Sequence, residues 1–223
     1  MLKSLVLSLR SLVLPVVLSL VLSSCATTTL NPLPVPPKPQ EEQDKRALEI
    51  FEQVVEVFSE SDRPTAVPKA EALYLKIIND YPDAALGQEC YWRLILIYLR
   101  DYTPPRFDKA EKYYSEFVRK YPQSPLRSEV DDSISNSFYS NGKWDKIIAF
   151  YTPVVRRYIE SGKLDRPHDI FLYAEAKMNL GDLVEAEKGY KIVIALFPKS
   201  REGTLAAQRL DELVKKKSTT NKI

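Results

Sequence analysis

Three segments of the chain repeat one spacing of residues: AEALYLKIINDYP at 70–82, AEKYYSEFVRKYP at 110–122 and AEKGYKIVIALFP at 186–198. In each, Tyr follows Ala by four residues, an apolar residue follows Tyr by three, and Pro follows Ala by twelve. The Tyr and the apolar residue share one helical face, the small Ala allows a neighbouring helix to approach closely, and Pro ends the helix. The recurrence predicts a chain built from repeated helical units.

The residues before these segments complete a two-helix unit. In LYAEAKMNLGDLVEA, residues 172–186, Gly181 and Asp182 fall in a turn between helices, and Ala174 and Ala186 occupy positions where the helices cross. This layout resembles the tetratricopeptide repeat, a helix-turn-helix unit of about 34 residues. The resemblance implies an all-α fold in which helix pairs stack into a right-handed superhelix with a concave inner surface.

One unit departs from the pattern. In ISNSFYSNGKWDKII, residues 134–148, Ile147 replaces the crossing Ala, and further on Ile159 replaces the terminal Pro. With these anchors, helical periodicity predicts four helix pairs and a C-terminal capping helix. The expected helices cover 41–59, 67–80, 85–101, 106–120, 125–140, 143–160, 167–180, 182–196 and 201–216.

The start of the chain has the layout of a secretory signal peptide. Lys3 and Arg10 precede an apolar stretch, which is followed by the small pair Ser23 and Ser24. The uncharged stretch after Arg10 is too short to cross about 30 Å of hydrocarbon, which disfavours a transmembrane helix. We therefore expect a signal peptide at 1–24.

Cys25 ends the quartet LSSC, which resembles the lipobox of bacterial lipoproteins. The resemblance implies cleavage before Cys25 and acylation of its thiol, so that several acyl chains hold the protein on a membrane. In Gram-negative lipoproteins an Asp directly after this Cys retains the protein at the inner membrane, and here that residue is Ala26. The implied location is the periplasmic face of the outer membrane. An ordinary signal peptide with a cysteine nearby is the alternative.

The residues after Cys25 predict a spacer. Residues 25–40 contain five prolines and no periodic apolar pattern, which favours a semi-rigid, extended tether over a folded segment. A proline-rich ligand for a partner is the alternative. The expected organisation is then a lipidated tether at 25–40, a repeat domain at 41–216 and a flexible tail at 217–223.

The charge balance excludes one class of partner. The chain has 32 basic and 30 acidic residues, and without Lys3 and Arg10 the numbers become equal. A neutral mature chain lacks the basic excess that binding to nucleic acid needs. Cys90, the only other cysteine, has no intramolecular partner if Cys25 is acylated, and we expect it to be a shielded free thiol.

The junctions between units refine the resemblance. YPDAALGQECYWRL, YPQSPLRSEVDDSI and FPKSREGTLAAQRL share an aromatic residue before Pro and an apolar residue twelve after it. They resemble the repeats of the outer-membrane assembly lipoprotein family BamD (YfiO), and related repeats in the Tol-Pal coordinator CpoB (YbgF). The first resemblance implies a part in outer-membrane β-barrel assembly. The alternatives are an adaptor of the Tol-Pal, cell-wall or division machinery, or a lipoprotein of another envelope complex.

Residues that could carry catalysis are sparse. The single histidine, His168, has no cysteine or second histidine at ligand spacing, and Ser140 and Lys143 fit a Ser-x-x-Lys spacing without its supporting motifs. No glycine-rich phosphate loop occurs. The sequence predicts a protein without enzymatic activity, cofactor or bound metal.

A binding groove is the sharper prediction. In tetratricopeptide arrays the first helix of each pair lines the groove, and the register assigns groove positions here; aromatic and apolar anchors flanked by carboxylates suit a peptide. For Trp92 and Leu96 a place in the core is the alternative, because residues 90–100 are apolar nearly all round. The predicted groove residues are Glu52, Glu56, Trp92, Leu96, Leu99, Asp132, Asn136, Tyr139, Phe171, Glu175 and Met178.

Overall fold

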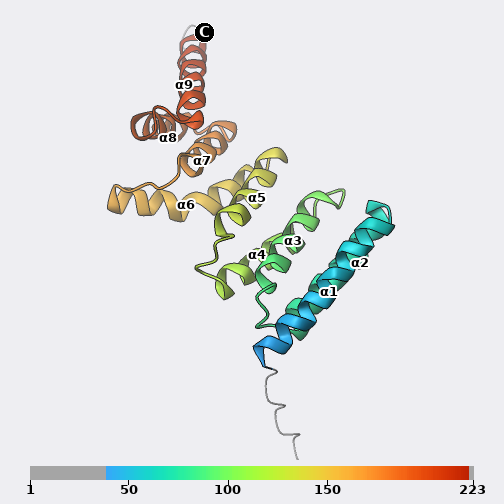
Figure 1. Ribbon diagram of the computed structural model, residues 1–223. Coiled ribbons are helices and arrows are strands. Elements are labelled where there is room, and N and C mark those ends of the chain that lie inside the picture. The colour runs from blue at the N-terminus through green and yellow to red at the C-terminus, as the bar shows by residue number, and fades with distance from the viewer. Residues whose placement is uncertain (1–38, 221–223) are drawn as a thin grey trace, which may run out of the picture. The chain divides into compact units, whose positions relative to one another are not determined.

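The computed structural model describes residues 39–220, with side chains as far as residue 215, and every element in that range is an α-helix (Figure 1). Cys25, the signal peptide and most of the tether lie outside the described residues. The helices are α1 (Gln40–Glu60), α2 (Arg63–Asp80), α3 (Gly87–Arg100), α4 (Phe107–Lys120), α5 (Arg127–Ser140), α6 (Trp144–Ser161), α7 (Pro167–Asn179), α8 (Leu183–Leu196) and α9 (Arg201–Thr220).

These helices confirm the expected order, with bounds within two residues of the expected ones except at two ends, which differ by four. Helix α2 begins at Arg63, four residues before the expected start, because the Asp62 carboxylate accepts a hydrogen bond from the backbone N–H of Thr65 at 2.9 Å. Helix α9 continues to Thr220, four residues beyond the expected end at 216. No Pro or Gly follows Gly203 to end this helix.

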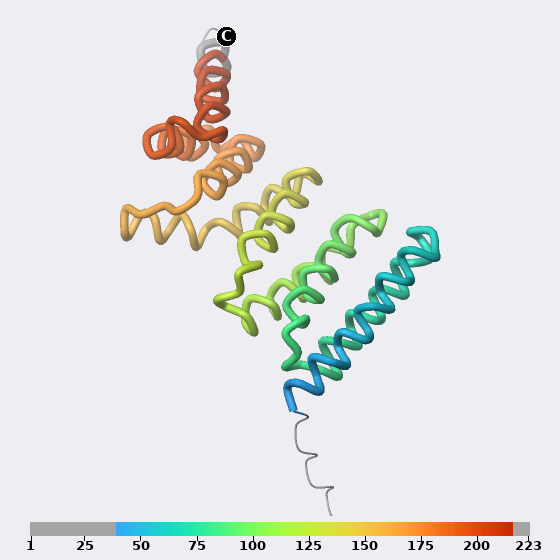
Figure 2. The backbone as a smooth tube through the Cα atoms, viewed as in Figure 1, coloured from blue at the N-terminus to red at the C-terminus, as the bar shows by residue number. Residues whose placement is uncertain are grey.

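Neighbouring helices pack in sequence order along the described residues. The chain path runs back and forth through α1 and α2, α3 and α4, and onward to α9, which packs on α8 and α7 (Figure 2). The apolar residues of these faces form one continuous core. Each pair therefore buries its apolar face against the next pair. Among the described residues, none of the helices is both long and apolar enough to cross a membrane.

Close helix approach depends on the crossing alanines. Ala70, Ala110 and Ala186, at the positions where the sequence predicts helix crossings, each have no exposed surface. Ile147 is equally buried at the same position of α6, and α5 and α6 contact one another much less extensively than the helices of the other pairs. The larger side chain keeps this pair of helices further apart.

The turn between α7 and α8 confirms the predicted geometry. Gly181 has a φ of +85°, a left-handed conformation that favours glycine, and the Asp182 carboxylate caps α8 by accepting from the backbone N–H of Glu185 at 3.2 Å. A β-carbon added at Gly189 would lie 2.7 Å from the β-carbon of Ala174. Helices α7 and α8 therefore approach more closely than two ordinary side chains would allow.

Cys90 lies in the core and is a free cysteine with no exposed surface. Burial raises the pKa of its thiol to about 12, so the thiol stays protonated at neutral pH. The prediction of a shielded free thiol is confirmed.

The crossing positions predict a matched pair of variants. Ala186→Ile should lower the free energy of unfolding by about 1–3 kcal/mol, because the added atoms have no space between α7 and α8. Ala195→Ile, which adds the same atoms at an exposed position of α8, should change it by less than about 0.5 kcal/mol. Urea unfolding followed by circular dichroism measures both, and equal effects would contradict the close-approach argument.

Candidate functional site

The residues predicted to line a groove differ widely in exposure. Three are exposed, five are half-buried, and three are buried with exposed fractions of 2–7%. The buried side chains contribute to packing between helices and offer a partner little surface. The exposed residues are Glu52, Glu56 and Asn136; the half-buried ones are Trp92, Leu96, Asp132, Tyr139 and Met178; the buried ones are Leu99, Phe171 and Glu175.

Glu175 is buried because three helices converge on its carboxylate. It accepts hydrogen bonds from the Tyr190 hydroxyl of α8 at 2.6 Å and from the Tyr139 hydroxyl of α5 at 2.9 Å. The Arg209 guanidinium of α9 pairs with it at 3.0 Å. A buried carboxylate with a charged partner and two further donors is fully satisfied, so Glu175 holds the capping helix α9 against the array.

Phe171 and Leu99 are buried for simpler reasons. The Phe171 ring packs against the Tyr190 ring with centroids 6.2 Å apart. Leu99 lies on α3, whose side chains are mostly buried because this helix packs against α2, α4 and α5. Repeat register assigned both to the groove because it describes helix faces and carries no information on how many neighbours cover them.

Trp92 and Asp132, which are half-buried, have partners in neighbouring units of the array. The Trp92 indole N–H of α3 lies 3.4 Å from the Ser133 hydroxyl of α5, and the Asp132 carboxylate accepts from Arg166 at 2.5 Å. Arg166 also pairs with Asp169 at 2.7 Å. These contacts link neighbouring units, so Trp92 and Asp132 present only part of their surface to a partner.

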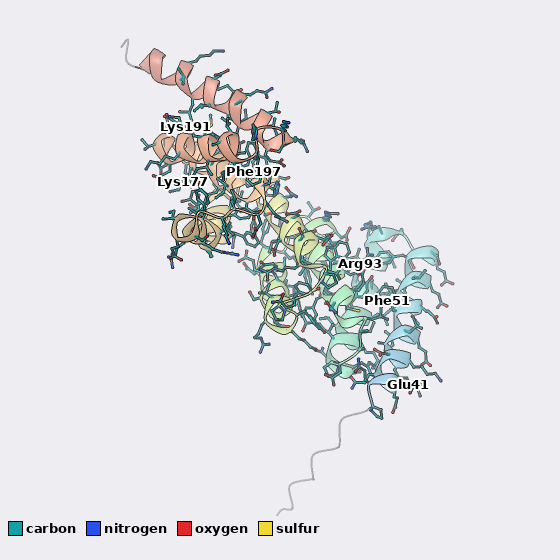
Figure 3. All side chains as sticks on the ribbon, turned by 60° about the vertical axis from the view of Figure 1, so that its left-hand side comes forward. Glu41, Phe51, Arg93, Lys177, Lys191 and Phe197 are labelled. Atoms are coloured by element: carbon teal, nitrogen blue, oxygen red, sulfur yellow. The ribbon has the colours of Figure 1, made fainter. Side chains whose placement is uncertain are left out.

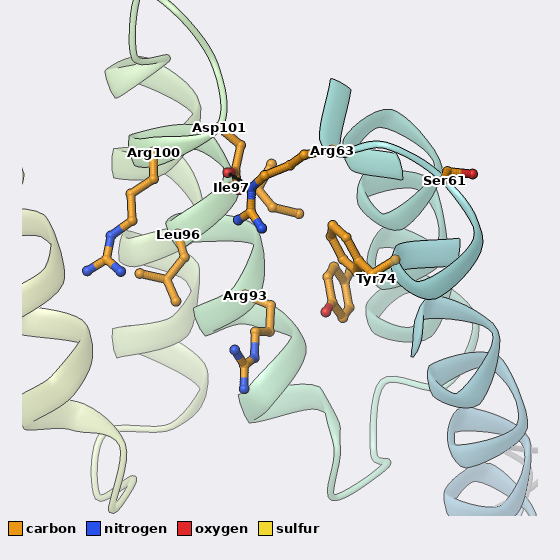
Figure 4. A pocket seen from close by; sticks show the side chains of 9 residues that line it. Ser61, Arg63, Tyr74, Arg93, Leu96, Ile97, Arg100 and Asp101 are labelled. Carbon is orange, nitrogen blue, oxygen red and sulfur yellow. Dashed lines mark hydrogen bonds and ion pairs between the residues drawn. The ribbon is translucent and has the colours of Figure 1, made fainter. Parts of the chain in front are cut away.

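An open pocket of about 440 Å³ lies between the first helix pair and α3, and we call it the α2–α3 pocket (Figure 4). Of the predicted groove residues it contains Leu96. Its walls come from the end of α1, from α2 and from one face of α3. The lining residues are Phe58, Ser61, Arg63, Tyr74, Arg93, Leu96, Ile97, Arg100 and Asp101.

The α2–α3 pocket carries an excess of positive charge. Its lining has three arginines and one carboxylate, that of Asp101, whose side chain is 7% exposed and pairs with Arg63 at 2.6 Å. Arg93 pairs with Glu89 at 2.7 Å on the surface of α3. Among residues 39–215, whose side chains the structure describes, Arg100 has no hydrogen-bond or ion-pair partner.

Apolar groups form the rest of this pocket. Tyr74 and Ile97 are each 4% exposed, and Leu96 is half-buried between Arg93 and Arg100. Burial raises the pKa of Tyr74 to about 12, so its hydroxyl remains neutral. Arginines beside an apolar wall can bind a carboxylate and a large apolar side chain together.

The sequence reasoning missed the arginines of this pocket. Arg93 and Arg100 are the two exposed residues between 91 and 100, and Arg93 projects from α3 in Figure 3. They are seven residues apart, which places them on one face of a helix with Leu96 between them. In the sequence, two positive charges at this spacing in an otherwise apolar helix could have indicated a charged face on α3.

The contact between α2 and α3 that supports the pocket is held by Glu71. Its carboxylate accepts from the Tyr98 hydroxyl at 2.8 Å, from the Tyr102 hydroxyl at 2.5 Å and from the Lys109 ammonium at 3.0 Å. Burial alone would raise the pKa of Glu71, but the hydrogen bonds from Tyr102, Tyr98 and Lys109 outweigh it and lower the pKa.

Comparison with known proteins agrees with this geometry at α7 and α8. A family model of the tetratricopeptide repeat matches residues 170–200. The match supports a tetratricopeptide-repeat protein, and the nine described helices form a helical superhelix of that type. No curated protein matches the chain. Folds of this kind are typically non-catalytic scaffolds that bind other proteins.

Groups suited to other chemistry are few in the described part of the chain. No cluster of three or more His, Cys, Asp or Glu side chains there could hold a metal ion. His168 is 26% exposed, and its Nδ1 lies 3.9 Å from a Glu202 carboxylate oxygen. It is half-buried between α7 and α9, where it contributes to packing between the two helices.

The Glu71 cluster predicts a pH-dependent contribution to stability. A carboxylate whose pKa is lower in the folded state stabilises the fold above its unfolded pKa and loses that contribution as the pH falls. Glu71→Gln should therefore lower the free energy of unfolding by about 2 kcal/mol at pH 7. The difference from wild type should shrink below about pH 4, near the ordinary pKa of Glu.

Urea unfolding at a series of pH values measures this effect. The matched control is Glu160→Gln, because Glu160 is exposed on α6 and its substitution should change stability little at any pH. A Glu71→Gln effect that stays constant from neutral to acidic pH would show that the charge of the carboxylate is unimportant.

Proposed function

We propose that this protein is a lipid-anchored scaffold on the periplasmic face of the outer membrane, where it binds envelope proteins during assembly of β-barrel proteins. The binding part of the proposal rests on the tetratricopeptide-type array, which typically binds proteins, and on its open, positively charged pocket. The membrane part rests on the LSSC quartet that ends at Cys25 and on Ala26 after it.

The tether fits a scaffold of this kind. Residues 25–40 carry five prolines, and an extended segment of this composition spans about 3.1 Å per residue. A domain on such a spacer can reach partners roughly 45 Å from the lipid surface. We infer that the acyl chains fix the location and the helical array supplies the binding surface.

The proposed role in β-barrel assembly rests on the junctions between repeats. The aromatic residue before Pro and the apolar residue twelve after it resemble the repeats of outer-membrane assembly lipoproteins. In this role the protein performs no catalysis and positions its partners by binding them. An adaptor of the Tol-Pal or cell-wall machinery would carry similar repeats, so the identity of the bound partner distinguishes the two functions.

The anchor has a direct test. Cys25→Ser should abolish incorporation of radiolabelled palmitate and move the protein from the membrane fraction to the soluble fraction, because the hydroxyl cannot carry the thioether-linked diacylglycerol. Cys90→Ser should leave both unchanged, since that thiol is buried in the core. Undiminished labelling of Cys25→Ser would exclude acylation at this position.

Crosslinking in intact cells tests the scaffold. A photoreactive residue at Asn136 or Leu96 should capture β-barrel assembly proteins, because both positions belong to the predicted binding surface and retain exposed surface. The control position is Ile159, which is 75% exposed on α6, outside the set of predicted groove helices. Capture of Tol-Pal or cell-wall proteins would replace the proposed role with the adaptor role, and equal capture from Ile159 would count against a groove.

A further inference from the structure

We propose that the α2–α3 pocket binds an extended acidic segment of a partner protein, in which two carboxylate side chains flank a large apolar side chain. The inference rests on the proposed scaffold function and specifies the chemistry that one part of the scaffold recognises. Its basis is the arrangement of Arg93, Leu96 and Arg100 along the open face of α3 (Figure 4).

The charges of the pocket favour an acidic partner. Among the described residues, Asp101 is the only carboxylate in the lining and is already paired with Arg63, so the positive charges of Arg93 and Arg100 are not neutralised by the lining. Arg100 has no partner among the residues whose side chains are described. The partner of Arg93 is Glu89, one turn away on the same helix, and the two side chains are 45% and 24% exposed. An exposed pair of this kind contributes little, so Arg93 can exchange it for another carboxylate.

The spacing of the arginines sets the spacing of the acidic residues. Seven helical residues correspond to a rise of about 10 Å between Arg93 and Arg100. An extended peptide in the polyproline II conformation has three residues per turn and rises about 3.1 Å per residue, so two acidic residues three positions apart lie on the same side, about 9 Å from each other. Planar guanidinium groups bind carboxylates with paired hydrogen bonds, which makes arginine well suited to such contacts.

The apolar residues of the pocket indicate a ligand that carries an apolar group as well as negative charge. Leu96 lies between the two arginines, and Phe58, Tyr74 and Ile97 complete the wall. A phosphate ion or a lipid headgroup would meet the arginines but leave this surface unfilled. A Leu or Phe side chain between the two acidic residues would cover it and gain from removal of apolar surface from water.

The tether of this chain does not have the charges needed to bind in the α2–α3 pocket. Residues 25–40 contain no Asp or Glu, and their only charged side chain is that of Lys38. A segment without carboxylates cannot pair with Arg93 and Arg100. The tether therefore cannot supply the acidic segment, and a partner protein is the proposed source.

A peptide array tests the proposed chemistry. The purified full chain in mild detergent is applied to short capped peptides that carry Leu or Phe between two Glu residues three positions apart. Replacing both Glu by Gln should weaken binding by about tenfold or more, because the Gln amide keeps the shape and removes the charge. Replacing the apolar residue by Ser should also weaken binding.

Charge reversal assigns the binding to this pocket. The double variant Arg93→Glu and Arg100→Glu should lose the preference for Glu over Gln peptides while keeping its helical circular dichroism, since both side chains are exposed. Arg119→Glu with Arg156→Glu makes the same change of charge at exposed positions outside the pocket and should keep the preference. An unchanged preference in the first double variant would overturn the inference.

Other outcomes overturn it as clearly. If Glu and Gln peptides bound equally well, the pocket would have no preference for acidic residues and the inference would fail. Inorganic phosphate or phosphatidylglycerol vesicles could compete with the array peptides as strongly as free acidic peptide does. That result would indicate a site for anions in general. Self-association that the pocket double variant abolishes would identify a second copy as the occupant. If crosslinking from Asn136 in cells persists while acidic specificity is absent, this inference fails and the scaffold function stands.

Discussion

The close crossing of paired helices at alanine is the constraint on which the rest of the array depends. A two-helix unit exposes an apolar face that it cannot bury alone, so units must stack, and stacking in register requires that each pair be compact. Ala70, Ala110 and Ala186 provide that compactness because a methyl group lets two backbones approach. Ile147 shows the converse, since the one pair with a larger crossing residue is also the one whose helices contact each other least.

Two carboxylates, one half-buried and one buried, connect units that apolar packing alone would leave free to slide. Glu71 collects donors from α3, the following loop and α4, while Glu175 collects them from α5, α8 and α9. Directional hydrogen bonds fix one relative position of the helices, whereas apolar contact tolerates several. In both clusters the donors include tyrosine hydroxyls, which combine an apolar ring for the core with a polar end for the carboxylate.

The fold could be predicted because its signals are local and repeated. Ala, Tyr and Pro recur at one spacing, and Gly181 marks a turn, so helix order followed from the chain alone. Exposure was harder, because it depends on which other helices cover a face. Glu175 has the register of a groove residue, yet Arg209, distant in sequence, covers it. The pocket arginines were overlooked because Arg93 and Arg100 are exposed residues of α3, and only the position of α2 shows that they border a cavity.

The burial of Cys90 has a consequence for the rate of thiol–disulfide exchange. Exchange begins with attack by a thiolate, and a thiol with a pKa of about 12 is ionised in only about one molecule in 10⁵ at pH 7. Any oxidant must also reach a sulfur that has no exposed surface. Kinetic protection of this kind lasts as long as the helix pairs stay folded, so oxidation of Cys90 would report transient opening of the array.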